Sequence, residues 1–137
     1  MPETNAMTHG IDHVGLTVSD LEASLAFFVE ALNWTEVGRK PDYPAAFVKD
    51  DKALVTLWQV KDQGAANSFD RHRNIGLHHL AFKIASNDEL DTLFSRIGDW
   101  PGVQVEFAPE FSGKGPKRHF MILEPGGNRI EFAWDPR

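Results

Sequence analysis

Two histidines occupy matching positions in two similar stretches of the sequence. His13 lies in IDHVGLTV (residues 11–18) and His79 lies 66 positions later in LHHLAFKI (residues 77–84). A carboxylate, Glu131, interrupts the apolar run NRIEFAW near the end of the chain. Two imidazoles and one carboxylate with open positions form a common ligand set for Fe(II), and similar sets hold Zn, Mn, Ni or Co. These residue types predict a site for one divalent metal ion, if the fold brings them together.

The first half of the chain contains the elements that must position His13. In residues 11–18 apolar and other side chains alternate, which predicts a half-buried strand. Residues 19–32 carry apolar side chains at helical spacing, and Ser19 with Glu22 matches a capping box. Three short strands are then predicted at about 34–40, 45–50 and 53–60.

The second half repeats this plan. Residues 77–84 form a strand, residues 86–100 form a helix that begins with the capping pair Ser86 and Glu89, and further strands follow at about 103–107, 118–123 and 129–134. An internal repeat of one β-α-β-β-β unit predicts an α+β fold of two modules within a single domain, residues 1–137. Module one spans about 9–60, a polar connector about 61–75 and module two about 76–135.

One helix can cover only one face of each four-stranded sheet. The large aliphatic residues of both first strands are assigned to that covered face, which leaves His13 and His79 on the uncovered face. In the last strand Phe132 turns to the helix and Glu131 to the uncovered face. A carboxylate within a sheet is costly unless it is paired or binds a cation. Singly, each residue has an ordinary explanation as a hydrogen-bonded histidine or a solvated charge, but the repeat favours metal ligation.

Other side chains are expected at the same cleft. In RHFMIL (residues 118–123) alternation turns His119 and Met121 towards Glu131. His119 is the candidate general acid or base, with a solvated histidine as the equal alternative. Trp58 either stacks on a substrate or packs between the modules. Less specific expectations are a basic glycine loop that closes over an anionic substrate (Lys114, Lys117 and Arg118), a structural His78 on the helix side, and surface positions for His9 and His72.

Composition limits the class of partner and location. The chain has 14 Lys and Arg against 20 Asp and Glu, a net charge of −6, which disfavours nucleic acid and anionic membranes as partners. No apolar run approaches the roughly 20 residues of a membrane span, and the first ten residues lack the features of a signal peptide. The absence of cysteine excludes disulfides and thiolate metal sites. A cytoplasmic protein is expected.

In the motifs DHVGLTVSDLEASLAFFVEALNW and EPGGNRIEFAW the sequence resembles the vicinal oxygen chelate superfamily over about residues 9–135. That family includes glyoxalase I, extradiol dioxygenases, fosfomycin-resistance enzymes, methylmalonyl-CoA epimerase and bleomycin-resistance proteins. The resemblance implies two modules whose sheets curl into a half-open, eight-stranded mixed sheet around a metal. It also implies that the ligands lie on first and last strands, which matches His13, His79 and Glu131.

The fourth ligand position of the family does not match. It aligns with Thr56, a poor ligand, where glyoxalase-type members carry Glu or Gln, and Gln59 nearby is expected on the opposite face. The remaining set of two histidines and one glutamate is also used by the extradiol dioxygenases of the superfamily. Those enzymes are generally larger, and the further His and Tyr that they use are not evident here, since Tyr43 is the only tyrosine.

The resemblance implies a small metal-dependent isomerase, lyase or ring-cleaving dioxygenase. It would chelate a small-molecule substrate through two vicinal oxygens, with Thr56, Trp58 and Met121 as candidate substrate contacts. The alternatives are a metal-free antibiotic-binding protein of the bleomycin-resistance kind and a module that binds a metal only structurally. Small members are commonly homodimers, and in some of them module one of one chain completes the site with module two of the other. The sequence leaves that choice open.

Overall fold

The computed structural model describes residues 5–137 as two successive units. Module one contains β1 (Val14–Val18), α1 (Leu21–Ala26), the π-helical turn η1 (Phe27–Ala31), β2 (Thr35–Lys40), β3 (Ala45–Lys49) and β4 (Leu54–Gln59). After the short 3₁₀ turn η2 (Gln63–Ala65), module two contains β5 (Leu80–Lys83), α2 (Asn87–Ile97), β6 (Gln104–Phe111), β7 (Arg118–Leu123) and β8 (Arg129–Trp134).

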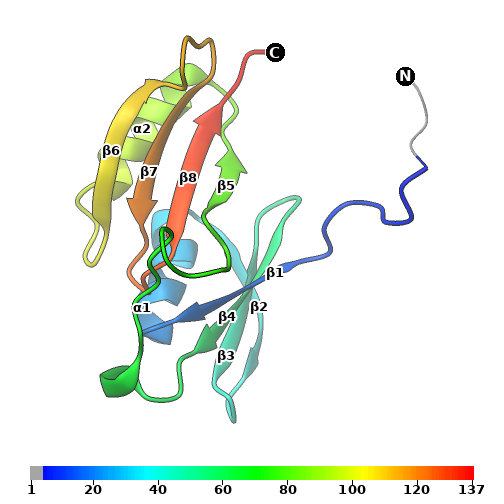
Figure 1. The fold of residues 1–137 in the computed structure, drawn as a ribbon, viewed down its shortest axis with the longest axis vertical. Coiled ribbons are helices and arrows are strands. Elements are labelled where there is room, and N and C mark those ends of the chain that lie inside the picture. The colour runs from blue at the N-terminus through cyan, green and yellow to red at the C-terminus, as the bar shows by residue number, and fades with distance from the viewer. Residues whose placement is uncertain (1–4) are drawn as a thin grey trace.

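The repeat is exact in strand order. Module one forms a sheet with the order β1-β4-β3-β2, and module two forms a sheet with the order β5-β8-β7-β6. The first strand of each module runs parallel to the fourth, and the other neighbours are antiparallel. The predicted α+β fold is therefore confirmed, with the eight strands divided between two separate four-stranded sheets. Figure 1 shows the two sheets one above the other along the long axis, with α2 covering one side of the upper sheet.

The helix-facing side of each sheet is the apolar side, as alternation predicts. Leu16 and Val18 of β1 and Phe132 of β8 belong to one continuous buried core. Edge-to-face ring contacts link the modules within it: Phe82 of β5 has its ring centroid 5.1 Å from that of Trp34 and 6.4 Å from that of Phe28. The opposite side of each sheet, called the open face below, is not covered by any helix of residues 5–137.

The two helices begin differently from one another. The prediction that Ser19 and Glu22 form a capping box is wrong, because Asp20 is the N-cap and accepts a hydrogen bond from Ala23 N–H at 3.2 Å. The backbone N–H of Ser19 instead donates to Gly126 O at 3.1 Å, a contact between the modules that local sequence does not reveal. In module two the predicted N-cap, Ser86, does accept from Glu89 N–H.

The β7–β8 turn of module two docks on the end of β1. Asn128 Nδ2 donates to Thr17 O at 3.1 Å, and Ser24 Oγ donates to the buried carboxylate of Glu124 at 2.6 Å. At the far end of α2, Arg96 donates to the backbone carbonyls of Ala31 and Glu30. These contacts hold the modules together through their helices and this turn, rather than through their open faces.

A methyl group at Gly126 should destabilise this junction. A Cβ built there lies 2.2 Å from Ser24 Oγ and 2.6 Å from Val18 Cβ, so both buried neighbours must move. Overpacking of this kind costs about 2 kcal/mol, and we expect Gly126→Ala to lower the free energy of unfolding in urea by that amount. Gly64→Ala is the matched control because the added Cβ meets only Asp62 Oδ1, at 3.5 Å. Equal stability of the two variants would contradict the tight docking.

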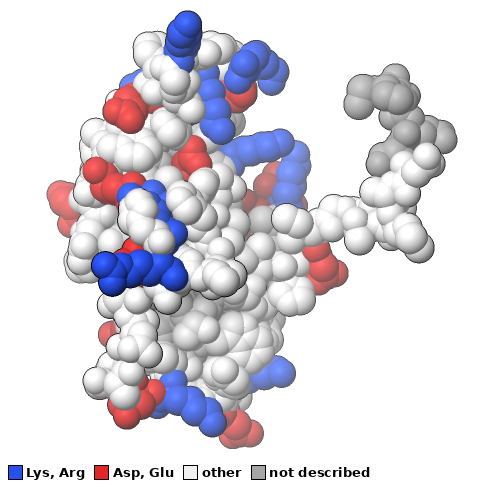
Figure 2. Space-filling model, in the orientation of Figure 1, with Lys and Arg blue, Asp and Glu red and all other residues white. Residues whose placement is uncertain are grey.

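None of the helices within residues 5–137 has the length and apolar character needed to cross a membrane. On the face shown in Figure 2, basic and acidic side chains are interspersed, and no large area carries a single sign of charge.

Candidate metal and substrate site

Glu131 is the centre of a polar cluster on the open face of module two. It lies in the middle of β8, opposite Ala81 of β5 and Met121 of β7, and is only 6% exposed. His79 Nε2 lies 3.0 Å from Glu131 Oε1, and His119 Nδ1 lies 2.5 Å from Glu131 Oε2. Each carboxylate oxygen therefore faces one imidazole, which compensates the cost of burying the charge. His79, His119 and Glu131, with Met121 beside them, lie together on the expected face.

His79 lies one residue before β5, just as His13 lies one residue before β1. Its Nδ1 is 2.8 Å from Nδ1 of His78. The prediction that His78 lies on the helix side is wrong: its side chain is exposed, because β5 begins only at Leu80 and alternation does not extend back to residue 78. Desolvation, followed by the positive charge of Arg129, lowers the pKa of His78. The contact with His79 lets the two imidazoles share a hydrogen bond.

Arg129 supports this corner of the site and was not foreseen. Its guanidinium makes two hydrogen bonds to the carboxylate of Glu106, at 2.9 and 2.6 Å, and donates to His78 O at 3.1 Å. The hydrogen bond from Arg129 is the main reason that the pKa of Glu106 is lowered, against the opposing effect of desolvation. Arg129 lies two residues before Glu131, so strand alternation, applied one step further, would have placed both on the same face.

His13 is separated from this cluster within one chain. Its side chain is 51% exposed and its Nδ1 lies 2.7 Å from Asp12 Oδ1. Among residues 5–137 of one chain, no three His, Asp or Glu side chains are arranged to hold a metal ion. The structure thus brings together two of the three predicted ligands, His79 and Glu131, and leaves His13 on the other module.

The open face of module one carries Thr56 and Trp58. Thr56 Oγ1 accepts a hydrogen bond from Trp58 Nε1–H at 2.8 Å, which already occupies the hydroxyl at the fourth ligand position. Gly15 lies beside them on β1, where a Cβ would come within 3.2 Å of Thr56 Oγ1. Gln59 lies on the opposite face as predicted. Its side chain accepts from Leu21 N–H and donates to Ser19 O at the start of α1.

Arg118 of the predicted basic loop does not face the cleft. Arg118 pairs with Asp91 of α2 at 3.2 Å, so its charge is turned to the helix side and the expectation that it reaches a substrate is wrong. The reason is the alternation along β7, which places Arg118 on the same face as the buried Phe120. His9 and His72 are exposed, as predicted.

The donor set fits a divalent metal ion in its chemistry. A nearly buried carboxylate and an imidazole from neighbouring strands, with a second imidazole holding the other carboxylate oxygen, are the ligand and support types found around such ions. His13, at the equivalent position of the other module, has the same donor atom type. Within one chain the modules pack through their helices and the β7–β8 turn, so His13 on module one does not join His79 and Glu131 on module two.

The comparisons with known proteins agree with this architecture. A family model described as the Glyoxalase/Bleomycin resistance protein/Dioxygenase superfamily matches residues 10–132. The glyoxylase/bleomycin resistance protein/dioxygenase domain from Frankia sp. EAN1pec is 25% identical, with a TM-score of 0.78 over 95% of this chain and 94% of that chain. Lactoylglutathione lyase from Agrobacterium tumefaciens is 22% identical, with a TM-score of 0.71 over 94% of this chain and 96% of that chain.

The fosfomycin resistance protein FosX from Listeria monocytogenes is similar to the same degree, with 21% identity and a TM-score of 0.71 over 93% of this chain and 94% of that chain. No curated protein sequence matches the chain. Because the family model spans nearly the whole repeat, including both first strands and most of β8, the chain belongs to the Glyoxalase/Bleomycin resistance protein/Dioxygenase superfamily.

Proposed function

We propose that the protein is a metal-dependent enzyme that acts on a small molecule with two vicinal oxygens. The observation that carries this proposal is the nearly buried Glu131 carboxylate, which faces His79 and His119 on the open face of module two. A structure of a FosX variant contains Mn(II) and 1S,2S-dihydroxypropylphosphonic acid, another similar structure is a lactoylglutathione lyase, and the description of the family includes dioxygenases.

His13, His79 and Glu131 would hold the ion. Two imidazoles and one carboxylate suit Fe, Zn, Mn, Ni and Co. When bound, the ion would act as a Lewis acid that stabilises negative charge on substrate oxygens. His119 holds the second oxygen of Glu131, which orients that carboxylate. His119 also lies directly against the ligand set, and its imidazole is the candidate to carry a proton to or from a substrate.

The site is completed, in this proposal, by a second copy of the chain. Each chain has two open faces and places His13 apart from His79 and Glu131. Two apolar residues at equivalent positions of the repeat, Ile11 and Leu77, are also exposed, by 82% and 46%. A homodimer in which module one of one copy faces module two of the other would cover these side chains and add His13 to the cluster.

Mixing two defective variants tests the shared site. We expect His13→Ala and Glu131→Ala proteins each to lose nearly all bound metal. After joint unfolding and refolding at equal amounts, half of the dimers are mixed, and each mixed dimer has one intact site. The mixture should therefore recover about a quarter of the wild-type metal content, measured by elemental analysis. Mixing without refolding is the control. No recovery after refolding would contradict a site shared between chains.

The reaction type can be narrowed by the metal that the protein contains. Elemental analysis of protein purified without a histidine tag should give about one ion per chain. Iron would direct assays towards catechols and O₂, and the other metals towards lyase and isomerase substrates.

A metal-free binding protein is the second candidate, favoured by the lack of three convergent ligands among the described residues of one chain. Absence of metal after reconstitution would support that candidate.

The cytoplasmic location and the exclusion of nucleic acid and membranes stay predictions from the sequence.

A further inference from the structure

The ring nitrogen Nδ1 of each candidate ligand histidine contacts the side chain of the residue before it. His13 Nδ1 lies 2.7 Å from Asp12 Oδ1, and His79 Nδ1 lies 2.8 Å from His78 Nδ1. Both histidines lie one residue before the first strand of their module, so the two contacts repeat with the fold. The hydrogen bond made by one ring nitrogen decides which nitrogen is left for a metal ion. These contacts therefore select the metal-binding atom of each histidine.

In module one the selection is direct. A carboxylate only accepts hydrogen bonds, so the hydrogen in the contact with Asp12 belongs to His13 Nδ1. The other ring nitrogen, Nε2, then keeps the lone pair that a metal ion requires. Histidines that bind metal ions usually donate their other ring N–H to a carboxylate or a carbonyl in this way. Asp12 thus leaves Nε2 of His13 as the donor atom.

In module two the preceding residue is itself a histidine, and either ring of the pair could donate. Arg129 decides between them. Its Nη1 lies 3.2 Å from His78 Nδ1 and donates to His78 O at 3.1 Å. A guanidinium has no acceptor, so His78 Nδ1 must be the acceptor, and the hydrogen shared with the next residue belongs to His79 Nδ1. If His78 Nδ1 carried the hydrogen instead, it would face an N–H group of Arg129.

Arg129 is fixed in the orientation that this requires. Its Nε and Nη2 donate to the two carboxylate oxygens of Glu106 at 2.9 and 2.6 Å, and its side chain is only 9% exposed. The planar fork of such a bidentate pair leaves Nη1 directed to residue 78. At the other side of the His79 ring, Nε2 lies 3.0 Å from Glu131 Oε1. The nitrogen that these contacts leave free therefore faces the carboxylate of the ligand set.

We propose that Asp12 and Arg129 are positioning residues of the metal site. Asp12 directly, and Arg129 through His78, keep a hydrogen on Nδ1 of each ligand imidazole. Nε2 of His13 and Nε2 of His79 are then the two nitrogen atoms offered to the ion. This inference rests on the proposed function for the role of the two histidines as ligands. The placement of the hydrogens belongs to the chain itself and precedes the binding of an ion.

Nuclear magnetic resonance of the imidazole nitrogens tests the placement of the hydrogens. Long-range ¹H–¹⁵N spectra of the full-length wild-type protein are recorded without metal and with Zn(II), and spectra of His13→Ala and His79→Ala identify the two rings. We expect a hydrogen on Nδ1 of both rings in both samples, and the large change on addition of Zn(II) at Nε2. A hydrogen-free Nδ1 in either ring would overturn the proposal.

Equilibrium dialysis against Zn(II) tests the path from Arg129 through His78. Arg129→Met and His78→Leu should each weaken binding about tenfold, as loss of a group that orients a ligand does. The double variant should lose no more than His78→Leu, because Arg129 acts through His78. His78→Asn keeps an acceptor near the position of Nδ1, so its binding should stay within about threefold of the wild type.

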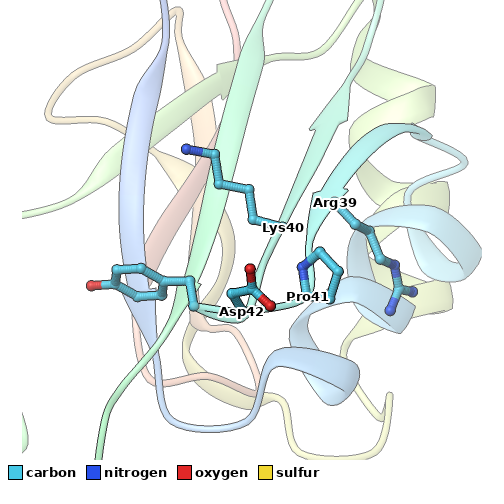
Figure 3. Close-up of a pocket in the computed structure, with 5 residues that line it drawn as sticks. Arg39, Lys40, Pro41 and Asp42 are labelled. Carbon is cyan, nitrogen blue, oxygen red and sulfur yellow. The ribbon is translucent and has the colours of Figure 1, made fainter.

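Arg39→Met is the matched control for Arg129→Met. Arg39 is also a strand arginine that pairs with glutamates, Glu22 and Glu36, but among the described residues it has no hydrogen bond or ion pair with a histidine. Figure 3 shows Arg39 at the hollow lined by residues 39–43, with its guanidinium directed away from Lys40. Zn(II) binding by Arg39→Met should equal that of the wild type.

The outcomes separate this inference from the proposed function. Equal weakening in Arg39→Met and Arg129→Met, or a hundredfold loss in the double variant, would overturn the path through His78. A hydrogen on Nδ1 of both rings in protein that binds no Zn(II) would uphold the placement of the hydrogens and reject the metal enzyme. Zn(II) binding of equal strength in the wild type, Arg129→Met and His78→Leu would uphold the metal site and reject this inference.

Discussion

Purified Glu131→Ala protein should contain almost no divalent metal, while wild-type protein reconstituted alongside contains about one ion per chain. Glu131 would supply the only anionic ligand of the set, and its two oxygens are held by His79 and His119. Changes to groups that merely support a ligand weaken metal binding 10- to 100-fold, so removal of the ligand itself should weaken it by at least about 100-fold. Equilibrium dialysis against Mn(II) or Zn(II) measures the difference.

Glu30→Ala is the matched control for this loss. Glu30 is an exposed glutamate of η1 whose backbone carbonyl, and not its carboxylate, accepts a hydrogen bond from Arg96. Metal binding by Glu30→Ala should equal that of the wild type. If Glu131→Ala binds the ion as tightly as this control does, Glu131 is not a ligand and the metal-dependent function is rejected.

Glu124→Ala should lower the free energy of unfolding by about 3–5 kcal/mol. Glu124 is 1% exposed, and its carboxylate accepts hydrogen bonds from Ser24 Oγ at 2.6 Å, from Gly126 N–H at 2.7 Å and from Asn128 N–H at 3.1 Å. The alanine variant leaves these donors without their acceptor at the junction of the modules. Each unsatisfied buried donor costs about 1–3 kcal/mol, with partial relief where water enters. Urea denaturation followed by circular dichroism gives the value.

Two comparisons identify the cause of that loss. Ser24→Ala removes one of the donors, so it should cost less than Glu124→Ala, about 1 kcal/mol. Glu30→Ala, at an exposed glutamate, should change stability by less than about 0.5 kcal/mol. A Glu124→Ala protein as stable as Glu30→Ala would show that the carboxylate does not hold the modules together.

The repeat and the faces of its strands follow from local sequence. Alternation in residues 11–18 places Leu16 and Val18 on one side of β1 because successive side chains of a strand point to opposite faces, whatever the rest of the chain does. The same rule turns Glu131, His119 and Met121 to the open face of module two. For this reason the approximate strand positions, the α+β fold and the shared face of Glu131 and His119 could be predicted before any contact was known.

Features that depend on distant contacts could not be predicted. Asp20, and not Ser19, caps α1, and the backbone N–H of Ser19 donates to Gly126 of module two. His78 leaves the helix side because β5 begins later than the apolar pattern suggests. The support of His78 by Arg129 requires the pairing of β8 with β5, which joins residues about 50 positions apart. Local periodicity contains no information on any of these contacts.

By itself, the sequence determined which donor atoms are present and, for Glu131, His119 and Met121, on which face of their strands they lie. His13, His79 and Glu131 are therefore recognisable as candidate ligands from residue type and alternation alone. Whether they meet was decided only by the tertiary structure, in which the modules pack through Phe28, Phe82 and the Glu124 turn, and not through their open faces. The physical reason is that ligand chemistry belongs to a single side chain, whereas the separation of two ligands depends on how every intervening element packs.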